Sequence, residues 1–323
     1  MDLFFKKKYY NREENMFMKN FEIEDGVLIR YIGHDTVVRI PDSVTSIGDS
    51  AFSWCKALTN IEIPNSVTSI GDWAFGGCSS LEEINLNSVT SIGDRTFLGC
   101  KRLTSVTIPN SVTSIGYETF YGCIGLTSVT IGNGVTSIGD YVFYGCTGLT
   151  SVTIPNSVTS IGDRTFLGCT GLTSVTIPNS VTSIGRYAFY GCTGLTNVII
   201  GNNIKYIEGN TFDVCKIKHK PKDNIAYKGF KSNMTCRDFQ YEEGKTYTCN
   251  KAKLCECGFH ACLNPLDCFN YYADKDTVYH EVILEDRTNE VGDDSKVCGK
   301  KITIGRRLTI HEMFSIFNEL NKE

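Results

Sequence analysis

A six-residue motif recurs through the first two thirds of the chain at an almost constant interval. The hexad SVTSIG or a close variant begins every 23 residues, with one interval of 22. Such self-similarity predicts a solenoid, because one unit cannot bury its own apolar side and must stack on its neighbours. The hexads begin at Ser43, Ser66, Ser88, Ser111, Gly134, Ser157, Ser180 and Asn203, and the last is degenerate.

Phenylalanine and cysteine recur in the same register. In one unit, Val152 and Ile154 alternate with hydroxyl residues, which is typical of a strand with one buried face. Pro155 ends that strand because proline cannot donate to a ladder, and Val158 and Ile161 then return to the interior. The in-register positions are Phe52, Phe75, Phe97, Phe120, Phe143, Phe166, Phe189 and Phe212, with Cys55, Cys78, Cys100, Cys123, Cys146, Cys169, Cys192 and Cys215.

The expected fold is therefore a repeat solenoid with a parallel β-sheet along its inner wall, followed by a small α+β domain. We expect an irregular leader over 1–20, an N-terminal cap over 21–42 and a solenoid of eight units over 43–215. A basic linker over 216–223 then leads to the α+β domain over 224–323. The degenerate last unit is expected to form the second end of the stack.

The repeat resembles the BspA-type leucine-rich repeat over roughly residues 21–215. That resemblance implies binding, often adhesion to host proteins or to other cells. No apolar run or small-residue cleavage site follows the lysines near the start, so we expect a cytoplasmic protein, with a surface adhesin as the alternative. The fifteen cysteines are then expected to be reduced.

Charge and hydropathy exclude few functions. The formal net charge is -4, with 32 basic and 36 acidic residues, which favours neither nucleic acid nor an anionic membrane. No run approaches the ~18 apolar residues of a membrane span. A protein partner is therefore the expected ligand.

The outward strand positions change character along the array. Its middle is a series of serine and threonine, without the aromatic and arginine residues that usually dominate protein-binding surfaces. This series is either a solvated hydroxyl ladder or a binding wall, and tyrosines beside the buried rows are further contact candidates where exposed. The candidate binding residues are Thr59, Glu62, Glu82, Glu83, Asn85, Thr107, Thr130, Thr153, Thr176, Tyr121, Tyr144 and Tyr190.

The C-terminal region combines strand-like runs with two helical patterns, at 265–272 and 309–320. Its densest chemistry is a cluster of thiols and one imidazole, which predicts either a structural zinc site or buried reduced thiols. A nucleophilic Cys/His pair using His260 or His280 is also open. The candidate zinc ligands are Cys255, Cys257, His260 and Cys262.

Two resemblances concern this region. Segments from Tyr227 to Val297, including Gly258-Phe259-His260-Ala261-Cys262, resemble an uncharacterised domain of bacteriophage and bacterial genomes, which implies a bacterial or phage setting. Tyr227-Lys228-Gly229 and the stretch from Gly258-Phe259 to Tyr271-Tyr272 also resemble ADP-ribosyltransferase folds. There Lys228 stands where histidine or arginine would hold the nicotinamide nucleotide.

These observations favour a non-enzymatic interaction or scaffold protein. The alternatives are an effector with a divergent ADP-ribosyltransferase-like domain, and a surface adhesin. An effector is expected to gather Lys228, His260, Tyr271 and Tyr272 around one pocket, whereas a binding module would scatter them or bury them in packing.

Overall fold

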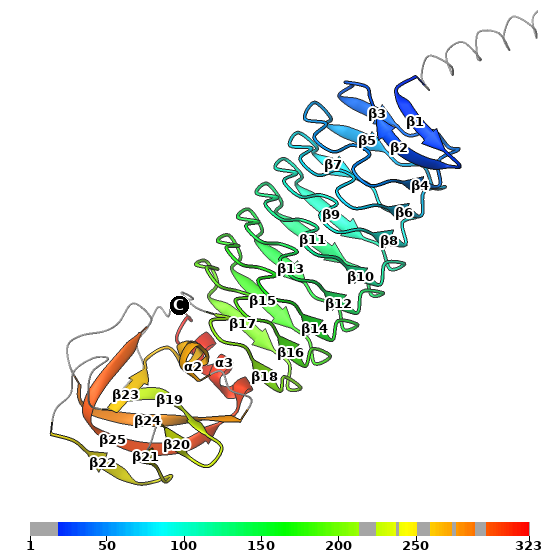
Figure 1. Cartoon of the computed structure of the whole chain (residues 1–323). Coiled ribbons are helices and arrows are strands. Elements are labelled where there is room, and N and C mark those ends of the chain that lie inside the picture. The colour runs from blue at the N-terminus through cyan, green and yellow to red at the C-terminus, as the bar shows by residue number, and fades with distance from the viewer. Residues whose placement is uncertain are drawn as a thin grey trace, which may run out of the picture.

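The computed structural model describes residues 19–212, 224–236, 239–250, 259–272, 276–287 and 295–322. A straight stack of coils is followed by a compact sheet domain at its C-terminal end (Figure 1). The predicted parallel solenoid of about eight turns is confirmed, as is a sheet-containing domain after it.

The longer strands of the coils form the predicted parallel wall. Residues one coil apart face each other, as in the pairing of Thr107 with Thr130 and of Thr130 with Thr153. This wall consists of β3 (Val37–Arg39), β5 (Asn60–Glu62), β7 (Glu83–Ile84), β9 (Ser105–Ile108), β11 (Ser128–Ile131), β13 (Ser151–Thr153), β15 (Ser174–Ile177) and β17 (Asn197–Ile200).

A second parallel row runs along another side of the coils and was not expected from the sequence. Each member is the Ser-Ile pair of the hexad, or its equivalent, and the isoleucine points into the core. Both rows are interrupted after the third coil, whose hexad follows the previous one after 22 residues instead of 23. The row consists of β4 (Ser46–Ile47), β6 (Ser69–Ile70), β8 (Ser91–Ile92), β10 (Ser114–Ile115), β12 (Ser137–Ile138), β14 (Ser160–Ile161), β16 (Ser183–Ile184) and β18 (Tyr206–Ile207).

A ladder of phenylalanine rings fills the core. From Phe52 to Phe212, consecutive rings lie 5.1–5.5 Å apart between centroids and are within 12° of parallel. Buried thiols reinforce the ladder, because each donates to the phenylalanine carbonyl of the previous coil, as Cys146 does to Phe120 at 3.2 Å. The described repeat cysteines form no disulfides, and all except half-buried Cys55 are buried.

An antiparallel hairpin covers the N-terminal end of the stack. It joins β1 (Phe21–Glu24) to β2 (Val27–Tyr31), and β2 pairs in parallel with β4. The Tyr31 ring stacks on Phe52 at 5.2 Å. This ring continues the phenylalanine ladder and shields the first coil from water.

The C-terminal domain is an antiparallel sheet of five strands in the order β22-β25-β23-β19-β24, with β24 also paired to β25. The long strand β25 therefore borders three others, and the sheet closes on itself. Its strands are β19 (Ile225–Lys231), β22 (Thr246–Thr248), β23 (Phe259–Cys262), β24 (Thr277–Arg287) and β25 (Lys296–Leu308). The short hairpin β20 (Thr235–Cys236) and β21 (Phe239–Gln240), the 3-10 turn η1 (Pro265–Asp267), and the helices α2 (Cys268–Tyr271) and α3 (Ile310–Glu319) complete the domain.

Helix α3 closes the C-terminal end of the solenoid. Thr309 caps it in a capping box with Glu312, and its Phe314 ring meets Phe212 edge-on at 5.0 Å. Asn318 acts as a further strand would: its Oδ1 accepts from the Val198 N–H at 2.8 Å, and its Nδ2 donates to the Val198 carbonyl at 2.7 Å. The last coil, expected from the sequence to be the end itself, is thus covered by a helix that begins about a hundred residues later.

We predict that Asn318→Ala lowers the free energy of unfolding by about 1–3 kcal/mol, since both polar groups of Val198 at the sheet edge lose their partner. Urea unfolding measures the loss, and faster amide exchange in β17 would locate it. Thr153→Ser, on the exposed wall, is the matched control and should change neither quantity. An unchanged exchange rate at Val198 would contradict the proposed edge cap.

Candidate functional site

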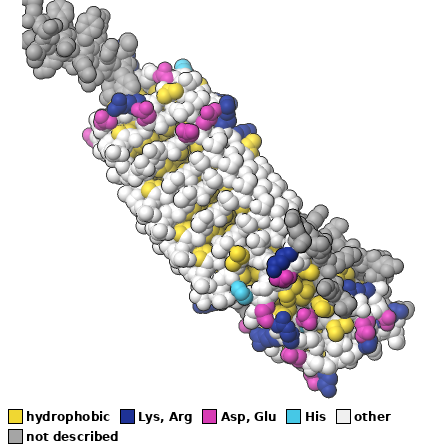
Figure 2. Space-filling model, turned by 180° about the vertical axis from the view of Figure 1, so that it is seen from behind, with side chains coloured by type: hydrophobic (Ala, Val, Ile, Leu, Met, Phe, Trp, Pro, Cys, Tyr) yellow, Lys and Arg dark blue, Asp and Glu magenta, His cyan; other side chains and the backbone are white. Residues whose placement is uncertain are grey.

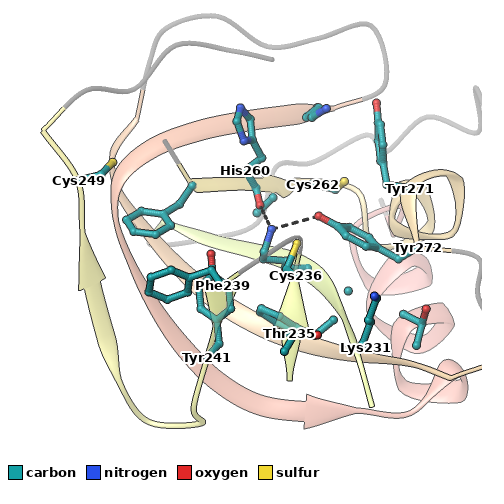
Figure 3. Close-up of a pocket in the computed structure, with 17 residues that line it drawn as sticks. Lys231, Thr235, Cys236, Phe239, Tyr241, Cys249, His260, Cys262, Tyr271 and Tyr272 are labelled. Carbon is teal, nitrogen blue, oxygen red and sulfur yellow. Dashed lines mark hydrogen bonds between the residues drawn. The ribbon is translucent and has the colours of Figure 1, made fainter. Parts of the chain in front are cut away.

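The C-terminal domain contains a pocket of about 490 Å³ at one end of its sheet. Side chains reach it from β19, β20, β21, β23 and the end of α2 (Figure 3). Among its described lining residues are three lysines and six aromatic residues, but no aspartate or glutamate. The pocket is therefore basic and aromatic.

Lys228 lies at the centre of this pocket. It is in the middle of β19, between β23 and β24, and only 4% of its surface is exposed. Its ammonium donates to the His260 carbonyl oxygen at 2.9 Å and to the Tyr272 hydroxyl at 3.1 Å. Burial lowers the pKa of this ammonium below its usual value, while thiols led by Cys236 act in the opposite direction.

A glycine allows Tyr272 to reach that position. A Cβ at Gly229, the next residue in β19, would lie 2.4 Å from Cβ and Cγ of Tyr272. The Tyr279 hydroxyl holds the tyrosine backbone by donating to the Tyr272 carbonyl at 2.7 Å. Burial raises the pKa of the Tyr272 phenol well above its usual range, so this side chain is neutral and acts as a hydrogen-bond partner for the lysine.

A buried polar network positions the turn before α2. Asn264 accepts from the Leu266 N–H at 3.1 Å and donates to Asp267 at 3.1 Å, and the Ser295 hydroxyl donates to Asp267 at 2.6 Å. The helix then presents Tyr271, which is 41% exposed, at the pocket. Lys296 lies over that ring with its Nζ 4.4 Å from the centroid.

All four residues named from the sequence for an effector pocket line this one cavity. Lys228, Tyr271 and Tyr272 contribute side chains, whereas the contact of His260 with Lys228 is made by its carbonyl oxygen. Sequence reasoning missed Lys231, Phe239, Tyr241 and Lys296. Periodicity gives no signal for them. Lys296 reaches the pocket through the long-range pairing of β25 with β23, and Phe239 and Tyr241 lie in or next to the short β20–β21 pair, which is separate from the main sheet.

The proposed zinc ligands are only partly described. Cys255 and Cys257 lie outside the described residues, and His260 and Cys262 lie on β23, with Cys262 buried. Within the described ranges, no group of three or more His, Cys, Asp or Glu side chains is arranged to hold a metal ion. His280, the other histidine considered for a nucleophilic pair, is buried with its Nδ1 3.0 Å from the Gly305 carbonyl.

The candidate solenoid residues fall into two regions. Thr107, Thr130, Thr153 and Thr176 are exposed and in register on the parallel wall. Toward the N-terminal end, Thr59 and Glu82 are half-buried, and Glu62, Glu83 and Asn85 are exposed. Arg102 pairs with Glu82 at 2.8 Å. On the face shown in Figure 2, charged side chains gather at both ends of the molecule, and the coils between carry few.

A different side of the coils carries stacked aromatic and arginine side chains. The Arg95 guanidinium lies between the rings of Trp73 and Tyr117, at 5.5 and 4.7 Å, and Arg164 lies between Tyr141 and Tyr187, at 5.2 Å from each. Contacts between Tyr117 and Tyr141 at 5.5 Å join the two groups. We call this surface the aromatic–arginine stripe; it comprises Trp73, Arg95, Tyr117, Tyr121, Tyr141, Tyr144, Arg164, Arg186, Tyr187 and Tyr190.

The three tyrosines predicted as contact candidates lie in this stripe. Tyr121 and Tyr144 stack face to face at 4.6 Å and 3°, and Tyr190 meets Tyr187 edge-on at 5.4 Å. All three are half-buried. Their rings are therefore partly available to a partner while neighbouring coils hold them in place.

Within the part of the chain that the structure describes, no helix is long and apolar enough to cross a membrane.

Comparison with curated proteins gives no match. Among solved structures, a leucine-rich repeat protein of T. pallidum is 28% identical with a TM-score of 0.44, covering 61% of this chain and 87% of that one. One from Bacteroides ovatus is 33% identical with a TM-score of 0.39, covering 53% and 54%. A leucine-rich cell surface protein of Faecalibacterium prausnitzii is 24% identical with a TM-score of 0.42, covering 59% and 83%.

Family models match both parts of the chain. A domain of unknown function (DUF7666) matches residues 224–316. The BspA type leucine rich repeat region matches residues 35–148 and 113–233, which together span more than half of the 323 residues. This chain therefore belongs to the BspA-type leucine-rich repeat family.

Proposed function

We propose that this protein is a non-enzymatic scaffold that binds a protein partner along the aromatic–arginine stripe of its solenoid. The observation that carries the proposal is the uninterrupted series of ring and guanidinium contacts from Trp73 to Tyr187. Tyrosine, tryptophan and arginine are the residues that contribute most often to binding energy at protein interfaces. The exposed threonines of the parallel wall lack such anchors.

Stacking also prepares the stripe for binding. Arg95 donates to Glu118 at 2.7 Å while it lies between two rings, so its long side chain is already ordered before a partner arrives. Less conformational entropy is then lost on association. The coils beneath the stripe share a close-packed core, which keeps the spacing of successive anchors fixed.

In this proposal the scaffold acts in the cytoplasm. Six repeat thiols donate to backbone carbonyls inside the core, an arrangement that suits a compartment where cysteines stay reduced. A surface adhesin of the same fold is the alternative, and partner capture from separate cytosolic and surface fractions distinguishes the two.

The stripe is tested by comparing the proteins captured by three forms of the full chain. The variant Y121S/Y144S/Y190S should lose at least about tenfold of the capture of any specific partner, because three half-buried aromatic side chains of the stripe are removed. The matched control, T130K/T153K, alters only the exposed wall and should retain capture. If the wall variant loses the partner and the tyrosine variant keeps it, binding occurs on the hydroxyl wall and the stripe proposal is wrong.

A second candidate function is favoured by the convergence of Lys228, His260, Tyr271 and Tyr272 on one pocket. It is an effector whose C-terminal domain transfers ADP-ribose to a target that the solenoid selects. The resemblance to ADP-ribosyltransferases and this convergence support the candidate. Transfer of ADP-ribose would also need a carboxylate near the nicotinamide–ribose bond that breaks. The described lining of the pocket contains no carboxylate.

Incubating the full chain with NAD tests this candidate. A transferase should release nicotinamide and add ADP-ribose to itself or to a captured partner, and Lys228→Met should abolish both signals. Mass spectrometry and nicotinamide release measure them. Absence of nicotinamide release, with or without NAD binding, would remove the effector candidate and leave the scaffold proposal intact.

A further inference from the structure

Among the described residues of the pocket, one buried cation has no acidic partner. Lys228 donates to neutral groups, a carbonyl and a phenol, and the Cys236 thiol is a further neighbour. Lysines are rarely buried to this extent unless paired, because removing an ammonium from water is costly. With no aspartate or glutamate in the described lining, the missing negative charge is best supplied by a ligand.

Two further lysines reach the same pocket from different elements. Lys231 is exposed at the end of β19, and Lys296, at the start of β25, is held over the Tyr271 ring. Three cations around one cavity attract anions, and they favour a ligand with more than one negative charge. A phosphate monoester meets that requirement better than a carboxylate.

Aromatic side chains form the remaining walls. In Figure 3, Tyr271 and Tyr272 lie on one side of the pocket, and Phe239 and Tyr241 lie on the opposite side. Such rings stack on flat ligands with little dependence on their substituents. A volume of about 490 Å³ is suited to a small organic molecule rather than to a polymer or a bare ion.

We propose that this pocket binds an aromatic phosphate monoester of the nucleoside monophosphate class. Its phosphate is held by Lys228, Lys231 and Lys296, and its ring stacks on the tyrosine side. Binding of this kind uses only the charge and shape of the pocket. It requires neither the partner-binding stripe nor any transfer reaction.

Calorimetric titration of the full chain tests the ligand class. The probes are AMP, GMP, CMP and UMP, with adenosine and inorganic phosphate as half-ligands. At least one nucleotide should bind with a Kd about tenfold or more below those of adenosine and phosphate, because only it uses both the cations and the rings. If no nucleotide binds, the proposal is overturned. If inorganic phosphate binds as tightly as the nucleotides, the aromatic part of the proposal fails.

Variants separate a ligand contact from a structural role. Lys228→Met should weaken nucleotide binding at least tenfold, because methionine has a similar shape but lacks the ammonium that would hold the phosphate. Lys300→Gln is the matched control, since Lys300 is exposed on β25 and does not line the pocket. It should bind as the native chain does.

A second pair of changes covers the case in which Lys228→Met does not fold. The K231Q/K296Q variant alters two side chains that are not fully buried and should also weaken nucleotide binding about tenfold. Its affinity for adenosine should stay unchanged, because the aromatic wall is intact. Equal losses for AMP and adenosine would indicate a collapsed pocket and would contradict direct contacts between the lysines and phosphate.

Discussion

Ring stacking between successive coils is the contact on which the rest of this molecule depends. Each phenylalanine of the ladder is fully buried only because the next coil supplies another ring at 5.1–5.5 Å. Such a series has no natural end, since the last ring always leaves one face open to water. In this chain, one further ring covers each end of the ladder. Tyr31 of the N-terminal hairpin continues the stack, and Phe314 of α3 closes it edge-on.

Closure by α3 joins the pocket to the solenoid. Phe314 contacts Phe212 on one side and Phe269 of α2 on the other, at 5.0 and 5.8 Å. Helix α2 ends at Tyr271, so the element that presents the tyrosines to the pocket rests on the end of the repeat array. One hydrophobic cluster accordingly runs from Leu28 to Phe317. A surface on the coils and a pocket in the terminal domain are thereby held within one packed body.

The coils were predictable from the sequence because their determinants are local and periodic. Alternating apolar residues specify the wall, and the Phe and Cys registers specify the core. The second row of strands was not predictable, since two residues of a hexad carry no strand periodicity. The role of α3 also required the structure, because Asn318 contacts Val198 across 120 residues of sequence. At the pocket, the resemblance to ADP-ribosyltransferase folds pointed to Lys228, His260 and the two tyrosines. Lys296 joins them only through the pairing of β25 with β23.

Two lysines of the same sheet differ in how their positive charge is balanced. Lys301, on the outer side of β25, pairs with Glu285 of β24 at 2.7 Å and remains partly in water. Lys228 is buried on β19, between β23 and β24, and faces only neutral groups among the described residues. A sequence selected for stability alone would favour methionine or leucine there, since replacing a buried ion by an apolar side chain of similar volume is often neutral or stabilising. Local departures from the rules of stable packing tend to occur where a protein binds or reacts. The cost of burying Lys228 is therefore the main reason to regard the pocket as a binding site rather than as a gap in packing.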